Sequence, residues 1–447
     1  MIRKISFILL GVCLTACLTL AQSRDLDPRI DQALPNLISI YHTIHSAPEL
    51  SHYEAKTSAL LAKQLSELGY TVTEHVGKYP NAAFKGYGVV AVMKNGAGPT
   101  VLVRTDLDAL PVEEKTALAF ASHVKMANDA GQEVPVMHAC GHDIHITSLI
   151  GTARMLAALK DRWHGTLVLI GQPAEELGAG AEAMLSDNLY SRFPKPDYAV
   201  ALHDTNDLPA GTVGYTPGYA LASVDSVDIL VRGVGGHGSR PEATKDPIVV
   251  AAQIVLALQT IVSRENSPFD PAVVTVGSIH GGTKNNIIPE EVRLQLTVRT
   301  YKEEVRQRIL NSIARISRYT ALAAGVPESL APVITAGEAP GPATYNNPAL
   351  TERLAAAFTK ALGREHVVQT KPIMASEDFG VFGLEGHQIP TCIFWIGAAD
   401  PAKYAESQKT GKPLPSLHSS QFAPDAEPTI RTGVKAMTSA VLELMQK

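Results

Sequence analysis

The segment MHACGHDIH, residues 137–145, concentrates ligand-type side chains within one short stretch of the chain. Its Cys140 and His142 form a C-x-H pair, and thiolate and imidazole are good ligands for zinc and similar transition metals. The pair alone is weak evidence, because a polar turn at the start of a helix can contain the same residue types. A further alternative makes Cys140 a nucleophile and His142 its base.

Two adjacent glutamates and two isolated histidines are further candidates. Glu175 and Glu176 follow the apolar run 167–170, His203 ends the apolar run 198–202, and His418 lies in SLHSSQF. One glutamate of such a pair can ligate a metal while the other accepts a proton from metal-activated water. The alternatives are a solvated acidic loop for the glutamates and hydrogen-bonded structural roles for the histidines.

Taken together, these residues favour a metal site over a thiol nucleophile, which would leave the glutamates and both isolated histidines unexplained. The candidate metal ligands are Cys140, His142, Glu176, His203 and His418. Five ligands are too many for one tetrahedral site with an open position, and they suit two metals that share a bridge. Asp106 and Asp108 are candidates to accept the second N–H of a ligating histidine, which fixes its tautomer.

The elements that must position these residues have the pattern of an α/β domain. The short runs 101–103, 167–170 and 198–202 are apolar on both faces, which is typical of strands in a buried parallel sheet. Between them, apolar residues recur at three- and four-residue steps from Ile146 to Ala157, which predicts a helix. In such sheets, ligands bind beyond the carboxyl ends of the strands, and the candidate residues follow those ends.

The sequence pattern changes after about Tyr219. Residues 223–233 and 291–301 alternate apolar and polar side chains, which predicts antiparallel strands with one solvated face. We therefore expect an α+β domain over residues 220–336, inserted between two parts of a catalytic domain, residues 22–219 and 337–447.

The predicted inserted domain contains two glycine-rich segments with candidate substrate ligands. His237 lies in GVGGHGSRPEATKDP, and Asn286 lies in GGTKNNIIPEEV. Glycine permits close backbone approach to a ligand, and imidazole and amide groups can bind a substrate carbonyl or carboxylate. The alternative is a pair of ordinary turns.

The composition and the N-terminal sequence limit the class of protein to which this chain can belong. The chain has 447 residues, is 45% hydrophobic and carries a formal net charge of −5, so a soluble globular protein without a nucleic-acid partner is expected. Residues 1–21 resemble a signal peptide, which predicts an exported protein, periplasmic or secreted. A lipid anchor at Cys17 and an uncleaved membrane anchor are the less favoured alternatives.

Two other features of the chain argue against a disulfide framework and a membrane span. Only Cys140 and Cys392 lie outside the predicted signal peptide, which is too few for a disulfide framework. The apolar stretch 248–262 is interrupted by Gln253 and Gln259, which predicts a mostly buried helix and no membrane span.

Six segments in this order resemble one family: RTDLDALPVEE, MHACGHD, GQPAEELGAGA, GGHGSRP, GGTKNNIIPEEV and SEDFG. The chain from about residue 37 to its end is similar to metal-dependent amidohydrolases, which include hippurate hydrolases, aminoacylase-like enzymes, N-acetyl-diaminopimelate deacetylases and auxin–amino acid conjugate hydrolases. The resemblance implies a dinuclear metallopeptidase-type catalytic domain, with a mixed sheet flanked by helices, and an inserted lid and dimerisation domain.

The resemblance also implies site roles. Cys140, His142, Glu176, His203 and His418 match the metal ligands. Glu175 matches the general base and acid, Asn286 a residue that holds the substrate carboxylate, and His237 a lid histidine that can reach the active site of a neighbouring subunit. A homodimer is therefore expected. The two divalent ions are expected to be zinc because of Cys140, with manganese, cobalt or nickel as alternatives.

The expected activity is hydrolysis of the amide bond of N-acyl amino acids. A dipeptidase or carboxypeptidase that acts on short peptides is the alternative on the same scaffold, and an inactive exported metal- or ligand-binding protein is the alternative of another class.

Residues 115–135 form a longer connection than the family usually has. This departure bears on substrate preference and leaves the expected chemistry unchanged.

Overall fold

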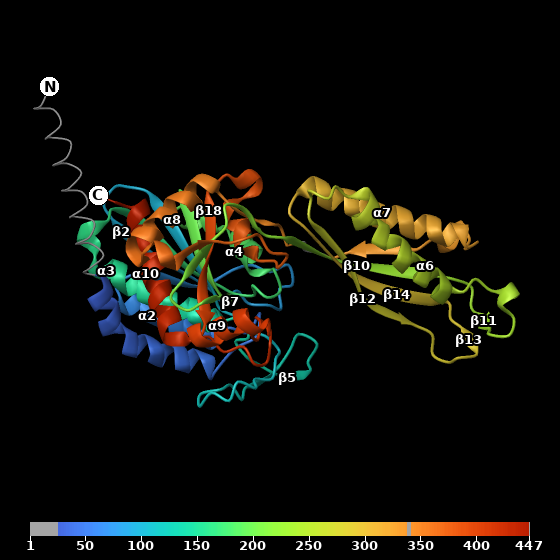
Figure 1. The fold of residues 1–447 in the computed structure, drawn as a ribbon, viewed down its shortest axis with the longest axis horizontal. Helices are drawn as coiled ribbons and strands as arrows, with labels where there is room; N and C mark the ends of the chain where they lie inside the picture. Colours follow the sequence, from blue (N-terminus) through green and yellow to red (C-terminus); the bar gives the residue numbers. More distant parts are fainter. Residues whose placement is uncertain (1–25, 338–340, 447) are drawn as a thin grey trace, which may run out of the picture. The chain divides into compact units, whose positions relative to one another are not determined.

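The computed structural model describes residues 26–337 and 341–446. The predicted signal peptide, residues 1–21, lies outside the described residues. The chain forms two compact units (Figure 1). The second consists of Tyr219–Thr344 and Pro372–Gly380, and the first contains the remaining described residues. The sequence places residues 372–380 in the catalytic domain, whereas main-chain bonds such as Ala222 N–H to the Ala375 carbonyl (2.8 Å) join this segment to the second unit.

An eight-stranded mixed sheet forms the centre of the first unit. Strand β3 pairs in parallel with β6 and β7, and β7 pairs in parallel with β18, whereas β1, β2 and β8 run antiparallel to their neighbours β2, β6 and β18. The mixed α/β sheet expected from the sequence is thereby confirmed. In order across the sheet, the strands are β1 (Thr71–Val76), β2 (Gly88–Asn95), β6 (Gly165–Gln172), β3 (Thr100–Asp106), β7 (Tyr198–Pro209), β18 (Thr391–Ala399), β8 (Val213–Tyr215) and β17 (Val367–Gln369).

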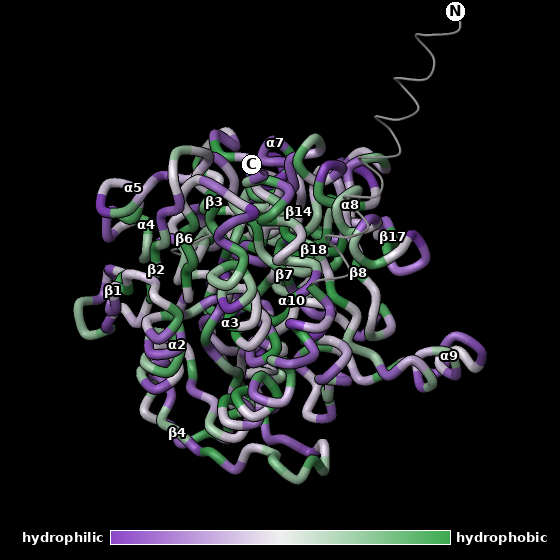
Figure 2. Tube along the Cα trace, turned by 90° about the vertical axis from the view of Figure 1, so that its left-hand side faces the viewer, coloured by the Kyte–Doolittle hydropathy of each residue, from purple (hydrophilic) through white to green (hydrophobic). Residues whose placement is uncertain are grey.

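Helices with apolar faces pack along this sheet. Helix α3 (His142–Ala158) contacts β3, β7 and α10 (Ala426–Leu444), and α2 (Ala55–Glu67) and α8 (Pro348–Leu362) contact α3 and α10 respectively. Figure 2 shows the hydrophobic colour around β7 and β18, whereas α9 (Pro401–Thr410) is largely hydrophilic.

The remaining elements outside the two main sheets are short. They are α4 (Gly180–Ser186), α5 (Leu189–Arg192), β9 (Gly218–Leu221), β16 (Thr344–Asn346) and the hairpin of β4 (Lys125–Ala127) and β5 (Glu133–Pro135).

Strand β7 is longer than the sequence predicts. We expected the strand to end at His203, but it continues to Pro209 because β18 pairs with it along nearly its whole length. Its pairing with β3 stops at Arg104 and Ala201, so His203 lies just beyond the part that β3 covers. This position leaves one side of His203 for contacts with Cys140 and with His142 at the start of α3.

The second unit is a four-stranded antiparallel sheet in the order β12 (Ala272–Gly281), β14 (Glu291–Thr300), β10 (Ser223–Arg232) and β15 (Val333–Ala336). Along β14, Val292, Leu294, Leu296 and Val298 are buried, which confirms the predicted alternation. Helices α6 (Pro247–Thr260) and α7 (Glu303–Ala323) contact β14. A short ribbon pairs β11 (Gly236–His237) with β13 (Ile287–Ile288).

Helix α6 exposes more apolar surface than the sequence predicts. With the π-helical turn Ile261–Glu265, it is long and apolar enough to cross a membrane by length and composition, and only about 33% of this stretch is buried. The prediction of a mostly buried helix is therefore wrong. One face of the helix is buried through Val250, Ile254 and Leu258, whereas Leu256 on the other face is 71% exposed. Both faces are apolar, so the sequence alone did not show that one of them is exposed.

Candidate metal centre

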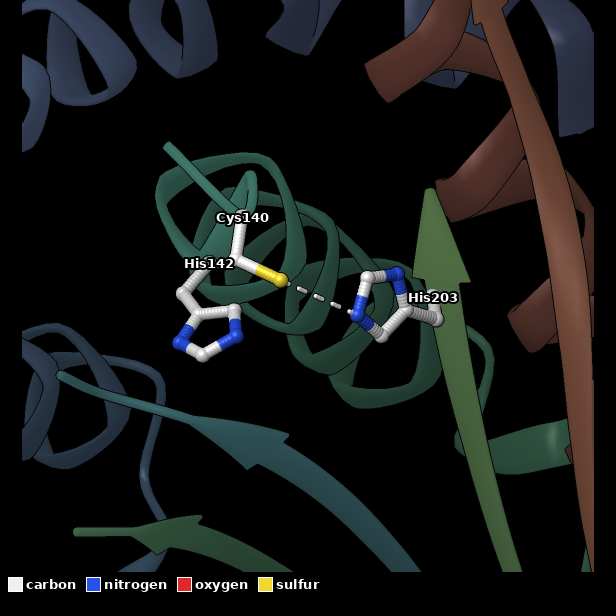
Figure 3. Close-up of side chains that lie close together, drawn as sticks. All are labelled: Cys140, His142 and His203. Carbon is white, nitrogen blue, oxygen red and sulfur yellow. Dashed lines mark hydrogen bonds between the residues drawn. The ribbon is translucent and has the colours of Figure 1, made fainter. Parts of the chain in front are cut away.

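Two overlapping sets of ligand atoms meet in the first unit and share the Cys140 thiol. One set consists of Cys140, His142 and His203, and the other of Cys140, Glu176 and His418. The Cys140 Sγ lies 3.6 Å from His203 Nε2, the contact drawn as a dashed line in Figure 3, and it lies 3.3 Å from His418 Nε2. The structure therefore brings together all five predicted ligands, and a donor that is common to two sets suits a bridged pair of metals.

The imidazoles of His142 and His203 are held in the same way. His142 Nδ1 lies 2.8 Å from the main-chain carbonyl oxygen of Asp108, and His203 Nδ1 lies 2.7 Å from that of Asp204. A carbonyl only accepts, so each Nδ1 carries a proton, and Nε2 is the ring nitrogen left in each residue to ligate a metal. The predicted orienting role of Asp108 is thus performed by its main chain, while its carboxylate Oδ1 lies 3.5 Å from the same ring nitrogen.

Glu175 and Glu176 bring both carboxylates to the cluster on the turn that follows β6. His142 Nε2 lies 3.8 Å from Glu175 Oε2 and 3.9 Å from Glu176 Oε1, and His418 Nε2 lies 3.5 Å from Glu176 Oε2. Among the described residues, His142 Nε2 and Glu176 Oε1 are buried without a hydrogen-bond partner. Buried polar atoms are normally satisfied, so these unpaired acceptors fit a site that holds cations.

Burial and charge also fit a cation site. Burial raises the pKa of the Cys140 thiol well above its usual range, and the neighbouring Glu176 carboxylate raises it further. Burial raises the pKa of Glu176 to about 7. A divalent cation would favour the thiolate and the carboxylate and so relieve this cost of ionisation.

The start of helix α3 depends on Gly141, between the first two candidate ligands. Gly141 has φ +74, and a Cβ at this position would collide with the carboxylate of Asp204. Glycine alone combines this left-handed conformation with such close approach. The backbone then turns so that Cys140 precedes the helix and His142 begins it.

A buried polar network supports the cluster from the sheet side. His145 Nδ1 donates to Asp106 Oδ1 (2.8 Å), and Asp106 also pairs with Arg104 (2.6 Å) on the same strand. The Nε2 of His145 lies 2.9 Å from the Asp204 nitrogen. His145 therefore has a supporting position, and sequence reasoning missed Arg104 and Asp204. Charged residues inside or directly after buried apolar strands were the signal that could have identified both.

His237 and Asn286 belong to the second unit, whereas the metal-ligand cluster belongs to the first. Strands β11 and β13 bring them together: Gly238 N–H donates to the Asn286 carbonyl (2.9 Å), and both residues line one groove with Lys284. His237 Nδ1 accepts from the Ser239 main-chain N–H at 3.1 Å, which leaves the proton on the exposed Nε2. This tautomer makes the Nε2 of His237, a residue that lines the groove, a hydrogen-bond donor.

The fold and this cluster define a family. Residues 102–418 match the sequence profile of Peptidase family M20/M25/M40. The chain belongs to this family, and it is a metal-dependent hydrolase that acts on amide bonds. The resemblance inferred from the six motifs is therefore confirmed.

Named relatives extend over most of the chain. Thermostable carboxypeptidase 1 of Saccharolobus solfataricus is 35% identical over 92% of this chain and 96% of its own length. Hippurate hydrolase of Campylobacter jejuni is 38% identical over 77% of this chain and 84% of its own. The Bacillus subtilis YXEP protein, described as a dinuclear metal-binding peptidase of the M20 family, superimposes with a TM-score of 0.73 at 27% identity, covering 93% of this chain and 99% of its own.

Proposed function

We propose that the protein hydrolyses the amide bond of N-acyl amino acids with two divalent metal ions and Glu175 as general base. The observation that carries this proposal is the Glu175 carboxylate beside two sets of donors that share Cys140. Relatives named hippurate hydrolase and N-acetyl-L-cysteine deacetylase, 38% and 37% identical, support the substrate class. A carboxypeptidase activity on short peptides is the second candidate, because a relative of that name aligns over 92% of this chain.

The metals would be held by Cys140, His142, Glu176, His203 and His418, and zinc is proposed because of the thiolate. When bound, the ions supply activation of a water molecule and polarisation of the amide carbonyl. Glu175 takes the proton of the attacking water and then passes it to the leaving amine. Main-chain bonds to the carbonyls of Asp108 and Asp204 keep His142 and His203 in the ligating tautomer throughout.

Substrate recognition is proposed to involve His237 and Asn286. The Nε2–H donor of His237 suits an oxyanion or carboxylate, and the Asn286 amide suits the carboxylate of the released amino acid. A homodimer through the second unit is also proposed, with His237 acting in the active site of the partner. The support for the dimer is the edge strand β12 and the adjoining exposed apolar side chains of α6, such as Leu256.

A paired measurement tests the activity. Purified protein with its metal content determined is assayed on N-acetyl and N-benzoyl amino acids and on unblocked dipeptides. We expect blocked amino acids to be the better substrates. Glu175→Gln should lower kcat by at least about a thousandfold with metal retained, whereas the exposed control Glu182→Gln on α4 should leave kcat unchanged. Near-normal turnover by Glu175→Gln would contradict the mechanism, and preference for dipeptides would favour the peptidase.

Export is proposed as well, because Arg3 and Lys4 precede an apolar run with a small-residue site near Ala21. The mass of the mature chain from a periplasmic fraction tests this. A chain that begins at Gln22 supports cleavage, a lipidated Cys17 supports the anchor, and an intact chain in the cytoplasm contradicts export.

A further inference from the structure

The carboxyl group of Glu54 points away from its own helix. Glu54 occupies the position directly before α2 and is 0% exposed, but its side chain makes no capping hydrogen bond to that helix. Its Oε1 instead accepts the main-chain N–H groups of Ala174 (2.7 Å) and His52 (3.1 Å). A buried carboxyl group therefore binds the residue that directly precedes Glu175, across 120 positions of sequence.

Ala174 has a conformation that needs such support. Its φ is +48, in the left-handed region that disfavours side chains with a Cβ, and the residue is completely buried. The turn closes behind it, since the Ala174 carbonyl accepts from Ala179 (3.2 Å) and Gly180 (3.1 Å). A strained residue persists only where its surroundings hold it, and Glu54 supplies a hydrogen bond to its N–H.

A second carboxylate holds the other side of Glu175. Asp108 Oδ2 accepts the main-chain N–H of Glu176 (3.0 Å) and the hydroxyl of Ser51 (2.6 Å). Ser51 and Glu54 lie in one short segment, which therefore binds the Ala174 N–H through Glu54 and, through Ser51, orients the Asp108 carboxylate that accepts the Glu176 N–H. The two bonds fix the backbone on either side of the proposed base.

We infer that Glu54 is a positioning residue for Glu175, which it directs at the metal-ligand cluster by holding Ala174 in the left-handed conformation. This inference rests on the proposed role of Glu175. Effective catalysis requires the base to lie within hydrogen-bond reach of its proton, and small displacements have large effects on turnover. Glu54 contributes through Ala174 and without contact to substrate.

A matched pair of substitutions tests this inference. Glu54→Met and Glu54→Gln have similar size, but only glutamine keeps an oxygen that accepts the Ala174 N–H. We expect Glu54→Met to lower kcat by about 10- to 100-fold with KM changed less than about twofold, and Glu54→Gln to stay within about threefold of wild type. Rates are expressed per metal-loaded chain, and melting temperature is measured on the same samples.

Two further variants separate positioning from folding. Glu49 is also buried, but its carboxylate accepts from Lys56 and Thr57 on α2, so Glu49→Met should lower the melting temperature and leave kcat unchanged. Glycine adopts positive φ without steric cost, so adding Ala174→Gly to Glu54→Met should restore part of the lost kcat. If Glu54→Met does not fold, this double variant and Glu54→Gln carry the comparison.

The outcomes distinguish the inference from the proposed function. Wild-type kcat for Glu54→Met, or equal losses for Glu54→Met and Glu54→Gln, would overturn the positioning role. If Glu54→Met folds and the double variant has no higher kcat, the positioning role is also contradicted. If Glu54→Met does not fold and the double variant neither folds nor turns over substrate, that result contradicts it as well. If Glu175→Gln measured in parallel retains full activity, the proposed function fails, whatever the Glu54 variants do.

Discussion

The Cys140 side chain has two possible roles in this site, as a metal ligand or as a nucleophile. Its Sγ lies within 3.6 Å of His203 Nε2 and 3.3 Å of His418 Nε2, and burial and Glu176 hold the pKa of the thiol well above its usual range. A nucleophilic cysteine needs a depressed pKa and an accessible sulfur, and Cys140 has neither in this protein. The environment favours a thiolate that forms on metal binding.

The substitution Cys140→Asp separates the two roles. A carboxylate has two oxygens that can serve two metals, so Cys140→Asp should retain metal and about 1–10% of wild-type turnover, whereas Cys140→Ala should lose both. Metal content by mass spectrometry and steady-state rates check this. If chelators leave the wild type fully active while Cys140→Asp with full metal is inert, the thiol is the nucleophile.

His45 links Glu114, directly before the long segment 115–135, to the first turn of α3. Its Nδ1 lies 2.7 Å from Asp143 Oδ2 and its Nε2 lies 3.1 Å from Glu114 Oε1. Burial disfavours the charged imidazolium, but hydrogen bonds and charge from Asp143 and Glu114 outweigh it and raise the pKa of His45 to about 10. The folded protein therefore keeps a proton that the unfolded chain releases near pH 6.5.

The stabilisation from His45 should consequently be complete below pH 6.5 and disappear as the pH rises to about 10. We expect the wild-type unfolding free energy to fall across this range by several kcal/mol more than that of His45→Gln, because each unit of pKa difference between the folded and unfolded states corresponds to about 1.4 kcal/mol. Urea unfolding of both proteins at several pH values measures the difference. Parallel curves for the two proteins would show that His45 is neutral in the folded state.

At the residue scale, the sequence was sufficient for side chains whose chemistry identifies them. That Cys140, Glu176 and His418 meet in one cluster could be predicted, because a thiol, a carboxylate and an imidazole together have few roles other than metal binding. Glu54 and Asp204 could not be predicted, because their importance comes from burial and from hydrogen bonds to distant main-chain atoms. No local pattern of the sequence records those partners.

At the element scale, the first turn of α3 depends on one glycine. Gly141→Ala combines an unfavourable φ of +74 with a collision with the Asp204 carboxylate. We expect a loss of about 2–3 kcal/mol of stability together with loss of bound metal, because Cys140 and His142 flank the site. Thermal unfolding and metal analysis of the purified variant provide the measurement.

Gly131→Ala is the matched control for that variant. Gly131 has nearly the same φ, +73, but no atom of the described residues lies within 4 Å of a Cβ added there. It should cost only about 1 kcal/mol and leave metal content unchanged. Equal effects of the two substitutions would show that backbone conformation, and not the approach of Asp204, determines the result.

Elements were predictable where one face of the pattern is polar. The alternation in β14 predicted its buried residues correctly, since only one register places them in the core. Helix α6 and strand β7 were misjudged because both are apolar on more than one side. A uniformly apolar segment does not show which face is buried or where pairing with β18 will stop.

At the scale of the whole molecule, the second unit has a sheet edge that no other strand of the described residues pairs with, and apolar side chains lie next to it. Strand β12 lies at one edge, and Leu256 and Ile279 are 71% and 53% exposed beside a groove between α6 and β12. Exposed edges and apolar patches of this kind mark interfaces. We therefore expect the wild type to be a dimer in sedimentation velocity, and Leu256→Glu to be a folded monomer. Val333→Glu on the opposite edge strand β15 should stay dimeric.

Mixing two inactive variants tests whether dimerisation completes the active site. Glu175→Gln and His237→Ala should each be nearly inactive, but if His237 acts in the partner's site, a mixed dimer holds one complete site. Unfolding and refolding them together should restore about a quarter of the wild-type rate, since about half of the dimers are mixed and each has one of two sites intact. Mixing should restore nothing when both variants also carry Leu256→Glu. No recovery from dimeric mixtures would show that His237 acts within its own chain or outside the reaction.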